Sequence, residues 1–379
     1  MQKYDYIITG MGASGLMLVY HMILDPFFNQ KQLLLVDKEI KNQNDRTWSF
    51  WEIGNGTWDE ILSKQWTNIY FGSTDFSKKI EISPYTYKTI RSKDFYSFVL
   101  DAIKGKSNIT IVHEELISVT DDKGSVKIET DQQVYLGHKV FNSILLSAAH
   151  KNQKQYPVLN QHFVGWFVKT KTSSFDAETA TFMDFKVAQN GNTRFMYVLP
   201  TSETEALFEY TLFSEDLLEE QEYEDEIVKY LKEKGIEEYQ IVEKERGCIP
   251  MTSYEFRKKN TKNILNIGTA GGWTKPSTGF TFNISLKNTQ KLIEFLKTKN
   301  DLSKFGKRTK FWYYDLLFLD VLHKDNGIGA TLFSKLFRKN KTTKILKFLD
   351  EETTFLEDIK ITTSLPWGRF LKALWNRIF

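Results

Sequence analysis

The chain has 379 residues, of which 41% are hydrophobic and 26% charged, a composition typical of a folded globular protein. The formal net charge of +3 does not favour a nucleic-acid partner, and the single cysteine, Cys248, excludes an intrachain disulfide and favours a reducing cytoplasm. No run approaches the roughly 20 apolar residues of a membrane span, and the N-terminus carries no targeting signal. We therefore expect a protein that is soluble or lies on a membrane.

The N-terminus predicts a strand, a glycine loop, a helix and a second strand. Residues 4–9 are a short apolar run, residues 10–15 read GMGASG, and residues 16–24 have helical composition. Residues 33–36 are a continuous apolar run, which is typical of a parallel strand buried on both faces. This order predicts a Rossmann-type βαβ unit.

The three glycines of this loop have separate roles. Gly10 permits the tight turn from strand to helix, Gly12 lets the backbone approach a pyrophosphate, and Gly15 lets the helix pack closely on the strand. The N-terminus of the helix offers free N–H groups and partial positive charge to the phosphates. Asp37 ends the second strand, where a carboxylate accepts hydrogen bonds from a ribose hydroxyl. We expect a nucleotide site; the alternative is a glycine-rich turn in an ordinary α/β protein.

The middle of the chain changes to a pattern of short alternating segments, which predicts an antiparallel sheet. Its four predicted strands are residues 162–171, 179–186, 194–200 and 206–214. A turn is expected at Gly191, between two of the strands, and a charged helix is expected at residues 215–234.

A second glycine-rich segment bears on the choice between FAD and NAD. Residues 264–282 read ILNIGTAGGWTKPSTGFTF: a strand, glycine turns, a proline and the start of a helix. In FAD enzymes of the hydroxylase and reductase type, such a segment closes over the ribityl chain and the flavin ring, usually with an acid after its first glycine. Here Thr269 follows Gly268, and its hydroxyl replaces part of that hydrogen bonding. We favour FAD, with Gly268, Thr269 and Gly279 among the residues that bind it.

The order of these segments predicts an α/β protein with a Rossmann-type FAD-binding fold, an inserted antiparallel-sheet substrate domain and a helical C-terminal region. We expect the FAD-binding domain at residues 1–150 and 240–300, the substrate-binding domain at 151–239, and the helical region at 301–379.

Three segments together resemble the lycopene β-cyclases of the bacterial type. They are residues 45–51 (DRTWSFW), residues 267–281 (IGTAGGWTKPSTGFT) and the region 197–211; residues 87–96 are also similar to the family. Members of this family bind FAD, need it reduced, usually by NADPH, and convert the linear ends of lycopene to β-rings without net redox change. The resemblance implies a lycopene β-cyclase that makes γ-carotene and then β-carotene.

The resemblance also implies that Glu209 is the essential carboxylate. The family often has a glutamate followed by a second acid and a threonine, whereas this chain has Glu209, Tyr210 and Thr211, a change expected to alter the pKa of Glu209. Ring closure begins with a proton on a terminal alkene, and a carboxylic acid in an apolar pocket suits that role because burial raises its pKa. The alternative is that Glu209 lies on a solvated face. Asp184 is a candidate acceptor of the released proton, or a structural polar group.

The carbocation needs an apolar, electron-rich surrounding. A reduced flavin would supply negative charge, and each aromatic face about 0.5–2 kcal/mol of cation–π attraction. The candidates to line the substrate cavity, each with core packing as its alternative, are Trp48, Trp51, Trp166 and Trp273. Arg46 and Arg91 are candidates to contact flavin or phosphate, with ordinary salt bridges as the alternative. No metal site is expected, because the six histidines lack paired ligand spacing.

The C-terminus predicts contact with a membrane, in which lycopene would be dissolved. In residues 366–379 one helical side is apolar, and the other carries Arg369, Lys372, Asn376 and Arg377. The apolar side consists of Trp367, Phe370, Leu371, Leu374, Trp375, Ile378 and Phe379. The alternative is a terminal helix docked on the protein's own core. Aromatic residues within the basic segment 304–347 are candidates to wall a substrate tunnel. We expect a cytoplasmic protein at the inner face of the membrane.

Two other functions fit parts of the sequence. A redox flavoenzyme of the same fold, such as a monooxygenase or a prenyl reductase, shares the glycine segments but makes a product that differs from its substrate by oxygen or hydrogen. A flavin- and carotenoid-binding protein without catalysis is unaffected by Glu209→Gln.

Overall fold

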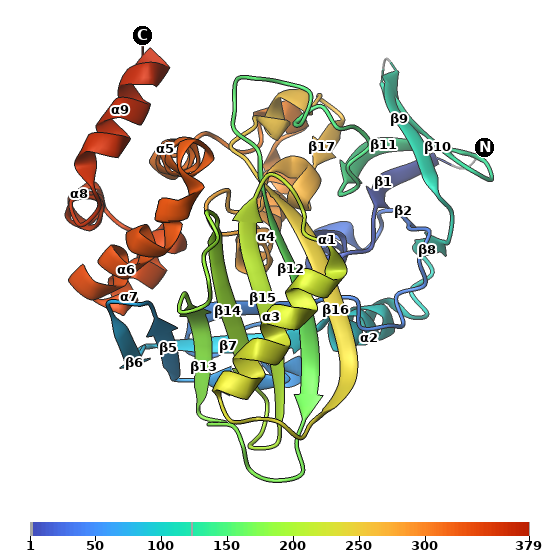
Figure 1. Cartoon of the computed structure of the whole chain (residues 1–379). Coiled ribbons are helices and arrows are strands. Elements are labelled where there is room, and N and C mark those ends of the chain that lie inside the picture. Colours follow the sequence, from blue (N-terminus) through green and yellow to red (C-terminus); the bar gives the residue numbers. More distant parts are fainter. Residues whose placement is uncertain (1–2, 123, 379) are drawn as a thin grey trace.

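The computed structural model describes residues 3–122 and 124–378, which form three β-sheets and a group of C-terminal helices (Figure 1). The first sheet has the order β8-β2-β1-β11-β10-β9, with β17 paired to β11. Its strands are β1 (Lys3–Thr9), β2 (Leu33–Val36), β8 (Ile109–Val112), β9 (Leu116–Asp122), β10 (Ser125–Thr130), β11 (Val134–Asn142) and β17 (Ile264–Asn266). The β8, β2, β1, β11 and β17 neighbours are parallel, so the predicted Rossmann-type unit is confirmed.

Helices pack on this sheet because their apolar faces are buried against it. They are α1 (Ala13–Leu24), α2 (Ser92–Ile103) and α4 (Phe282–Thr298). Leu16, Val99 and Leu292, one from each helix, lie in one buried apolar cluster with Ile8 and Leu35 of the strands. The start of α1 is thereby fixed at the carboxyl end of β1, where the glycine loop lies.

The second sheet has the order β16-β12-β15-β14-β13-β5-β6, and its neighbouring strands are antiparallel except for β13 and β5, which are parallel. Its strands are β5 (Asn68–Gly72), β6 (Ser77–Glu81), β12 (Leu159–Lys169), β13 (Thr179–Asp184), β14 (Thr193–Pro200), β15 (Glu205–Ser214) and β16 (Gln240–Met251). The four predicted strands are β12 to β15, and the expected turn at Gly191 has a φ of +79°. Helix α3 (Glu220–Glu233) lies across one face of the sheet (Figure 1).

This sheet draws strands from outside the predicted substrate domain. The segment 240–251, which we expected in the FAD-binding domain, is β16 and pairs along its length with β12. Strands β5 and β6, from the predicted domain 1–150, form the other edge. Edge strands keep one side in water and so carry charged residues, which hides the apolar alternation of a strand in the sequence.

A third sheet has the order β3-β7-β4 and consists of β3 (Thr47–Ile53), β7 (Tyr85–Arg91) and β4 (Lys64–Trp66). The C-terminal helices gather at one side of the molecule (Figure 1). They are α5 (Lys310–Lys324), α6 (Gly329–Lys339), α7 (Thr342–Leu349), α8 (Phe355–Thr362) and α9 (Trp367–Ile378). In the described ranges, none of the helices has the length and apolar character needed to cross a membrane.

Candidate active site

A cavity of about 370 Å³ lies where the glycine segments meet the second sheet. Its walls include Gly12 of the first glycine loop, Gly268 and Gly279 of the second, and Tyr197 and Glu209 of the antiparallel sheet. Residues separated by more than two hundred positions in the chain thus line one cavity. The volume is within the range of small-molecule and cofactor sites.

The two glycine segments contact each other directly. Gly268 has a φ of +58°, and a Cβ atom there would lie 2.8 Å from Ser14 Oγ. Ser14 Oγ in turn lies 2.8 Å from Ser285 Oγ at the start of α4. A Cβ at Gly15 would lie 2.1 Å from the carbonyl oxygen of Gly10, so only glycine fits there. This close packing is the arrangement that we expected from the two motifs.

Asp37 closes the first glycine loop at the end of β2. Its Oδ2 accepts a 2.6 Å hydrogen bond from the Met11 N–H, and its Oδ1 accepts a 2.9 Å bond from the Glu39 N–H. Lys41 Nζ is 3.5 Å from Oδ2. Because a carboxylate has about four acceptor positions, Asp37 holds the loop and still has acceptor capacity toward a ribose.

Glu209 lies in β15 with its side chain on the cavity side of the sheet. Its cross-strand neighbours are Gly165 on β12 and Tyr197 on β14. Phe208 and Tyr210 point to the opposite face and pack under α3, as strand alternation requires. Only 8% of Glu209 is exposed. Burial and the nearby Glu245 carboxylate raise the pKa of Glu209 well above its ordinary value.

Two tyrosines lie beside Glu209: Tyr87 is fully buried and Tyr197 is partly buried. The hydroxyl oxygens of Tyr87 on β7 and Tyr197 on β14 are 2.5 Å apart. Burial raises the pKa of both phenols above their ordinary value, with the Glu209 carboxylate contributing in the same direction. Both phenols are therefore neutral, and they link the third sheet to the strand that pairs with Glu209.

Glu245 on β16 is a second buried carboxyl beside Glu209, which the sequence did not indicate. It pairs with Gly165 from the side opposite Glu209. A Cβ atom at Gly165 would lie 2.8 Å from Glu209 Cγ and 3.1 Å from Glu245 Cγ, so both side chains pass over this glycine. Thr47 Oγ1 donates a 2.8 Å hydrogen bond to Glu245. The signal in the sequence was Gly165, a glycine inside an apolar strand, because such a glycine often marks a place where other groups approach the backbone closely.

Charged groups on neighbouring elements change the pKa of Glu245. Burial raises its pKa to about 7, and Glu243 acts in the same direction, while the Thr47 hydrogen bond and the charges of Arg91 and Arg46 act against this rise. Arg91 forms a 2.5 Å ion pair with Glu243 and lies over the Phe167 ring, 3.9 Å from its centroid. Arg91 therefore forms an ordinary salt bridge, which was the alternative to contact with flavin or phosphate. It does not line the cavity.

The structure separates the other predicted residues into two groups. Arg46, Trp48 and Thr269 line the cavity, and Trp48 stacks on Phe282 with their ring centroids 5.4 Å apart. Trp51 and Trp273 are buried behind the cavity wall. Trp51 packs edge-on against Phe280, with ring centroids 4.8 Å apart, and Trp273 packs against Phe305. These two tryptophans therefore pack in the core, which was the alternative to lining the substrate cavity.

Trp166 and Asp184 lie on the wrong face of the sheet for the roles predicted for them. Trp166 packs with Phe208 beneath α3, and its indole Nε1 donates a 3.3 Å hydrogen bond to Glu224. Asp184 is fully buried and accepts a 2.9 Å hydrogen bond from the Tyr230 hydroxyl of α3. Their sequence positions were compatible with either face, and the register places both toward α3. Asp184 is a structural anchor here.

The fold and the cavity define a protein of the α/β class with a Rossmann-type nucleotide-binding fold. Similar solved structures include a p-nitrophenol 4-monooxygenase from Pseudomonas putida DLL-E4, 13% identical, with 98% of this chain and 99% of that chain covered and a TM-score of 0.60. A geranylgeranyl bacteriochlorophyll reductase-like protein from Thermoplasma acidophilum is 13% identical, with 99% and 96% coverage and a TM-score of 0.58. At this identity the likeness concerns the fold.

The family follows from the sequence comparison. A model of the family described as "Lycopene cyclase protein" matches residues 5–374, so the chain belongs to the lycopene cyclase family. Among curated proteins, a chloroplastic neoxanthin synthase from Solanum tuberosum is 24% identical over 303 residues. The match covers 73% of this chain and 57% of the plant protein, so the chain spans little more than half the length of that relative.

Proposed function

We propose that the protein is a lycopene β-cyclase that uses reduced FAD, with NADPH as the source of electrons. It converts the linear ψ-ends of lycopene to β-ionone rings, giving γ-carotene and then β-carotene, without net oxidation or reduction. The observation that carries this proposal is the buried Glu209, held neutral by its surroundings, in a cavity shared with both glycine segments.

The residues present fit FAD. The glycine loop at the start of α1 would hold the pyrophosphate, Asp37 the ribose, and Gly268 and Thr269 the ribityl chain and ring. Among the described residues, Gln161 Oε1 and Thr278 Oγ1 are buried without a hydrogen-bond partner, and both residues border the cavity. Unpaired buried polar atoms are costly in a folded protein, and a bound polar group satisfies them. When bound, reduced FAD supplies negative charge beside a developing cation.

Glu209 donates its carboxyl proton to the terminal double bond of a ψ-end. The neighbouring double bond attacks the resulting tertiary cation, a carbon–carbon bond closes the ring, and a ring proton leaves. One proton enters and one departs, so no electrons are exchanged. Phe163, Phe195 and Phe282 line the cavity and exclude water, while the face of Trp48 stabilises positive charge.

Glu245 positions the proton on Glu209. Two carboxylates that meet over one glycine repel each other when both are ionised, so the pair retains a proton near neutral pH. Because Asp184 lies on the other face, the Glu209 and Glu245 pair is the proposed acceptor of the proton that leaves the ring.

The test is to express the chain in a bacterium that accumulates lycopene and to separate the pigments by chromatography with mass detection. We expect products of unchanged mass with rings at one or both ends, absent when Glu209→Gln is expressed. Glu205→Gln, on the same strand and paired with Lys169 at the surface, is the matched control. A product heavier by one oxygen or two hydrogens would identify a redox flavoenzyme. Lycopene that stays unchanged despite bound FAD would indicate another polyene or binding alone.

We also propose peripheral contact with the inner face of the membrane through α9. Its small Ala373 faces α5, and Arg369 and Arg377 form ion pairs with Asp325 and Asp320. Those arginines are thus used within the protein rather than for lipid headgroups. The apolar side points outward, with Leu371 53% and Ile378 63% exposed. Phe379, the last residue of the predicted stripe, lies outside the described residues. An apolar helical face in water favours insertion into a lipid interface.

A further inference from the structure

The C-terminal helices line a second apolar cavity, which we call the groove. It is separate from the cavity that Glu209 lines. Its volume is about 270 Å³, and its walls come from α5, α6, α7, α8 and α9. Leu336 of α6, Phe348 of α7 and Leu365 after α8 are typical of its side chains. Of the predicted tunnel aromatics, Tyr314 and Phe318 of α5 belong to this wall. An apolar cavity of this size attracts apolar ligands rather than water.

This groove adjoins the Glu209 cavity. Thr278 lines both spaces, and the short loop from Ser277 to Phe280 is the partition between them: Ser277 lies on the groove side and Phe280 on the Glu209 side. Thr278 Oγ1 is one of the buried atoms without a hydrogen-bond partner in the described chain. Backbone hydrogen bonds from the Thr278 and Gly279 N–H groups to the Lys275 carbonyl hold this loop. It is a single thin partition, and a molecule that spans both cavities would have to displace it.

The other end of the groove reaches the molecular surface at α9. Trp367, Leu371 and Leu374 line the groove, and each is at least 41% exposed. Asp315 is a charged residue that lines the groove. Its charge is compensated by a 2.9 Å ion pair with the buried Lys275, so it does not make the groove hydrophilic. The groove is thus apolar from its mouth on the proposed membrane-facing helix to the partition at Thr278.

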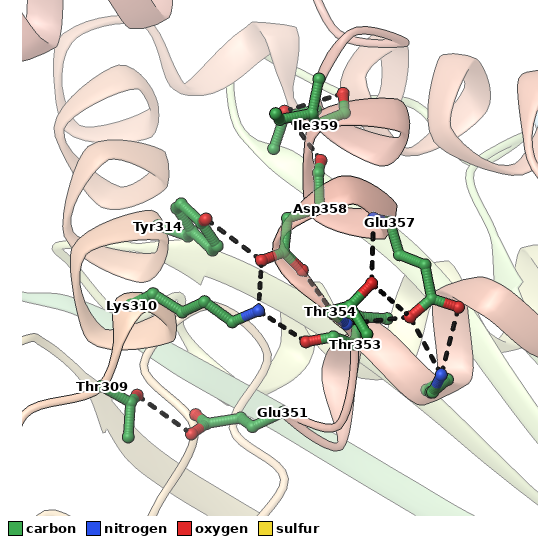
Figure 2. Close-up of polar contacts among 11 residues, drawn as sticks. Thr309, Lys310, Tyr314, Glu351, Thr353, Thr354, Glu357, Asp358 and Ile359 are labelled. Carbon is green, nitrogen blue, oxygen red and sulfur yellow. Dashed lines mark hydrogen bonds and ion pairs between the residues drawn. The ribbon is translucent and has the colours of Figure 1, made fainter.

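A network of polar contacts fixes the wall formed by α8 (Figure 2). Asp358 at the start of α8 forms a 2.6 Å ion pair with Lys310, accepts a 3.2 Å hydrogen bond from Tyr314, and accepts a 2.5 Å bond from Thr353. Thr354 and Glu357 form a capping box at the same turn. These contacts tie α8 to α5, so the groove is formed before any ligand enters.

We propose that this groove binds the unreacted remainder of a linear polyene while one end of the molecule lies at Glu209. The inference rests on the proposed function, because it takes the substrate to be a long linear hydrocarbon. Such a molecule is far longer than the end that becomes a ring, and the Glu209 cavity must also accommodate the cofactor. A second apolar space that shares a wall residue with that cavity and opens at a lipid-facing helix has the chemistry and position to hold the rest.

The proposal is tested with a lycopene analogue that carries a photoreactive diazirine at one end. The FAD-loaded full-length protein is mixed with phosphatidylcholine and phosphatidylglycerol vesicles that contain the probe, irradiated, and mapped by mass spectrometry. We expect adducts on α6 and α9, at groove residues such as Leu336 and Leu374. Leu336→Trp fills the interior of the groove and should abolish these adducts. Leu374→Trp narrows the mouth and should do the same even if the first variant folds poorly.

The matched control is Leu356→Trp, because Leu356 is 77% exposed on α8 and does not line the groove. It should keep the adducts of the wild type. A diazirine fatty acid is the second probe: equal labelling of the groove by it would mean a lipid acyl chain is the occupant and would overturn the proposal. Adducts that persist in both groove variants would also overturn it.

The same samples separate this proposal from the proposed function. Glu209→Gln should lose ring formation and keep the groove adducts. Groove adducts in a wild-type protein that forms no rings would refute the cyclase and leave the polyene groove standing. Ring formation without groove adducts would refute the groove and leave the cyclase standing.

Discussion

Glu209 on β15 and Glu245 on β16 extend over the same residue, Gly165, from its two sides. Strand β12 lies between their strands, and glycine is the one residue that leaves both side chains room. Each of the two residues is 8% exposed. Two acids so placed are coupled in their titration, because ionisation of one opposes ionisation of the other.

This pair also bears on the role of position 210, where the chain has Tyr210 and related proteins often have a second acid. Adjacent residues of a strand point to opposite faces, so residue 210 faces α3 and not the cavity. Its hydroxyl accepts a 3.3 Å hydrogen bond from Arg194 on that side. The acidic neighbour of Glu209 in space is Glu245 on β16, about 36 residues further along the chain. Strand register, and not adjacency in the sequence, brings the two acids together.

Glu245→Gln should shift the pH dependence of cyclisation. Activity requires protonated Glu209, so it falls as pH rises through the pKa of that group. The variant removes a negative charge that raises this pKa. The alkaline fall in rate should therefore move to lower pH, as measured by ring formation in lycopene-containing vesicles across the pH range. Glu205→Gln, which removes a carboxylate paired with Lys169 at the surface, is the control. An unmoved or raised midpoint in Glu245→Gln would contradict the pairing.

The same residue should affect stability. The folded-state pKa of Glu245 is raised from 4.5 to about 7, so between these values the folded state binds more protons than the unfolded state. Stability is therefore lost as pH rises through this window. One pKa unit corresponds to about 1.4 kcal/mol, so the loss is on the order of 3 kcal/mol. Urea unfolding at pH 5 and pH 8 should show a smaller decline for Glu245→Gln than for the wild type. Equal declines would show that Glu245 titrates normally.

Gly165→Ala should damage the site without removing either acid. Its Cβ would lie 2.8 Å from Glu209 Cγ and 3.1 Å from Glu245 Cγ, closer than ordinary contact, so the two glutamate side chains must shift. Overpacking of this kind costs about 1–3 kcal/mol. We expect a reduced cyclisation rate with FAD still bound, measured as rate per bound flavin. Gly368→Ala, where no described atom lies within 4 Å of the added Cβ, is the control. Full activity in Gly165→Ala would refute the tight contact.

Much of this architecture could be predicted because it depends on local patterns. The glycine loop after β1, the alternation of β12 to β15 and the apolar spacing of α4 each carry their signal within a few residues. The sequence indicated that both glycine segments serve one nucleotide site, but the particular contact of Gly268 with Ser14 is a finding of the structure.

The errors concern faces and partners between distant strands. Asp184 and Trp166 were candidates for the cavity, each with a structural role as its alternative, and the register of the sheet turns both toward α3. Glu245 was overlooked because β16 is an edge strand with charged residues on both sides of the alternation. Single-sequence patterns fix the period of a strand and leave open which face is buried.

Gly12→Leu should separate folding from FAD binding. Apart from Gly12 and its neighbours in the chain, no atom of the described residues lies within 4 Å of a Cβ placed at Gly12, so the fold leaves room for a Cβ there. The added side chain would occupy the space that we assign to the pyrophosphate. We expect a folded protein with a near wild-type circular dichroism spectrum that lacks flavin absorbance. Gly15→Ala is the contrasting variant, since its Cβ meets the Gly10 carbonyl oxygen and should impair folding. Retained flavin in Gly12→Leu would place the cofactor elsewhere.

Charged substitutions on the outward side of α9 should release the protein from vesicles. Ile378 is 63% exposed and does not line the groove, so Ile378→Asp removes apolar surface without blocking the polyene path. Burial of an isoleucine in lipid contributes about 1.5–3 kcal/mol, so its loss should weaken binding by roughly tenfold or more. Cosedimentation with phosphatidylglycerol vesicles measures the effect. Lys372→Gln, on the opposite side of α9, tests whether the remaining cation also contributes and should have a smaller effect that disappears at high salt. If Ile378→Asp sediments like the wild type, α9 is not the membrane contact, and the exposed apolar residues of α8, Phe355 and Leu356, become the next surface to alter.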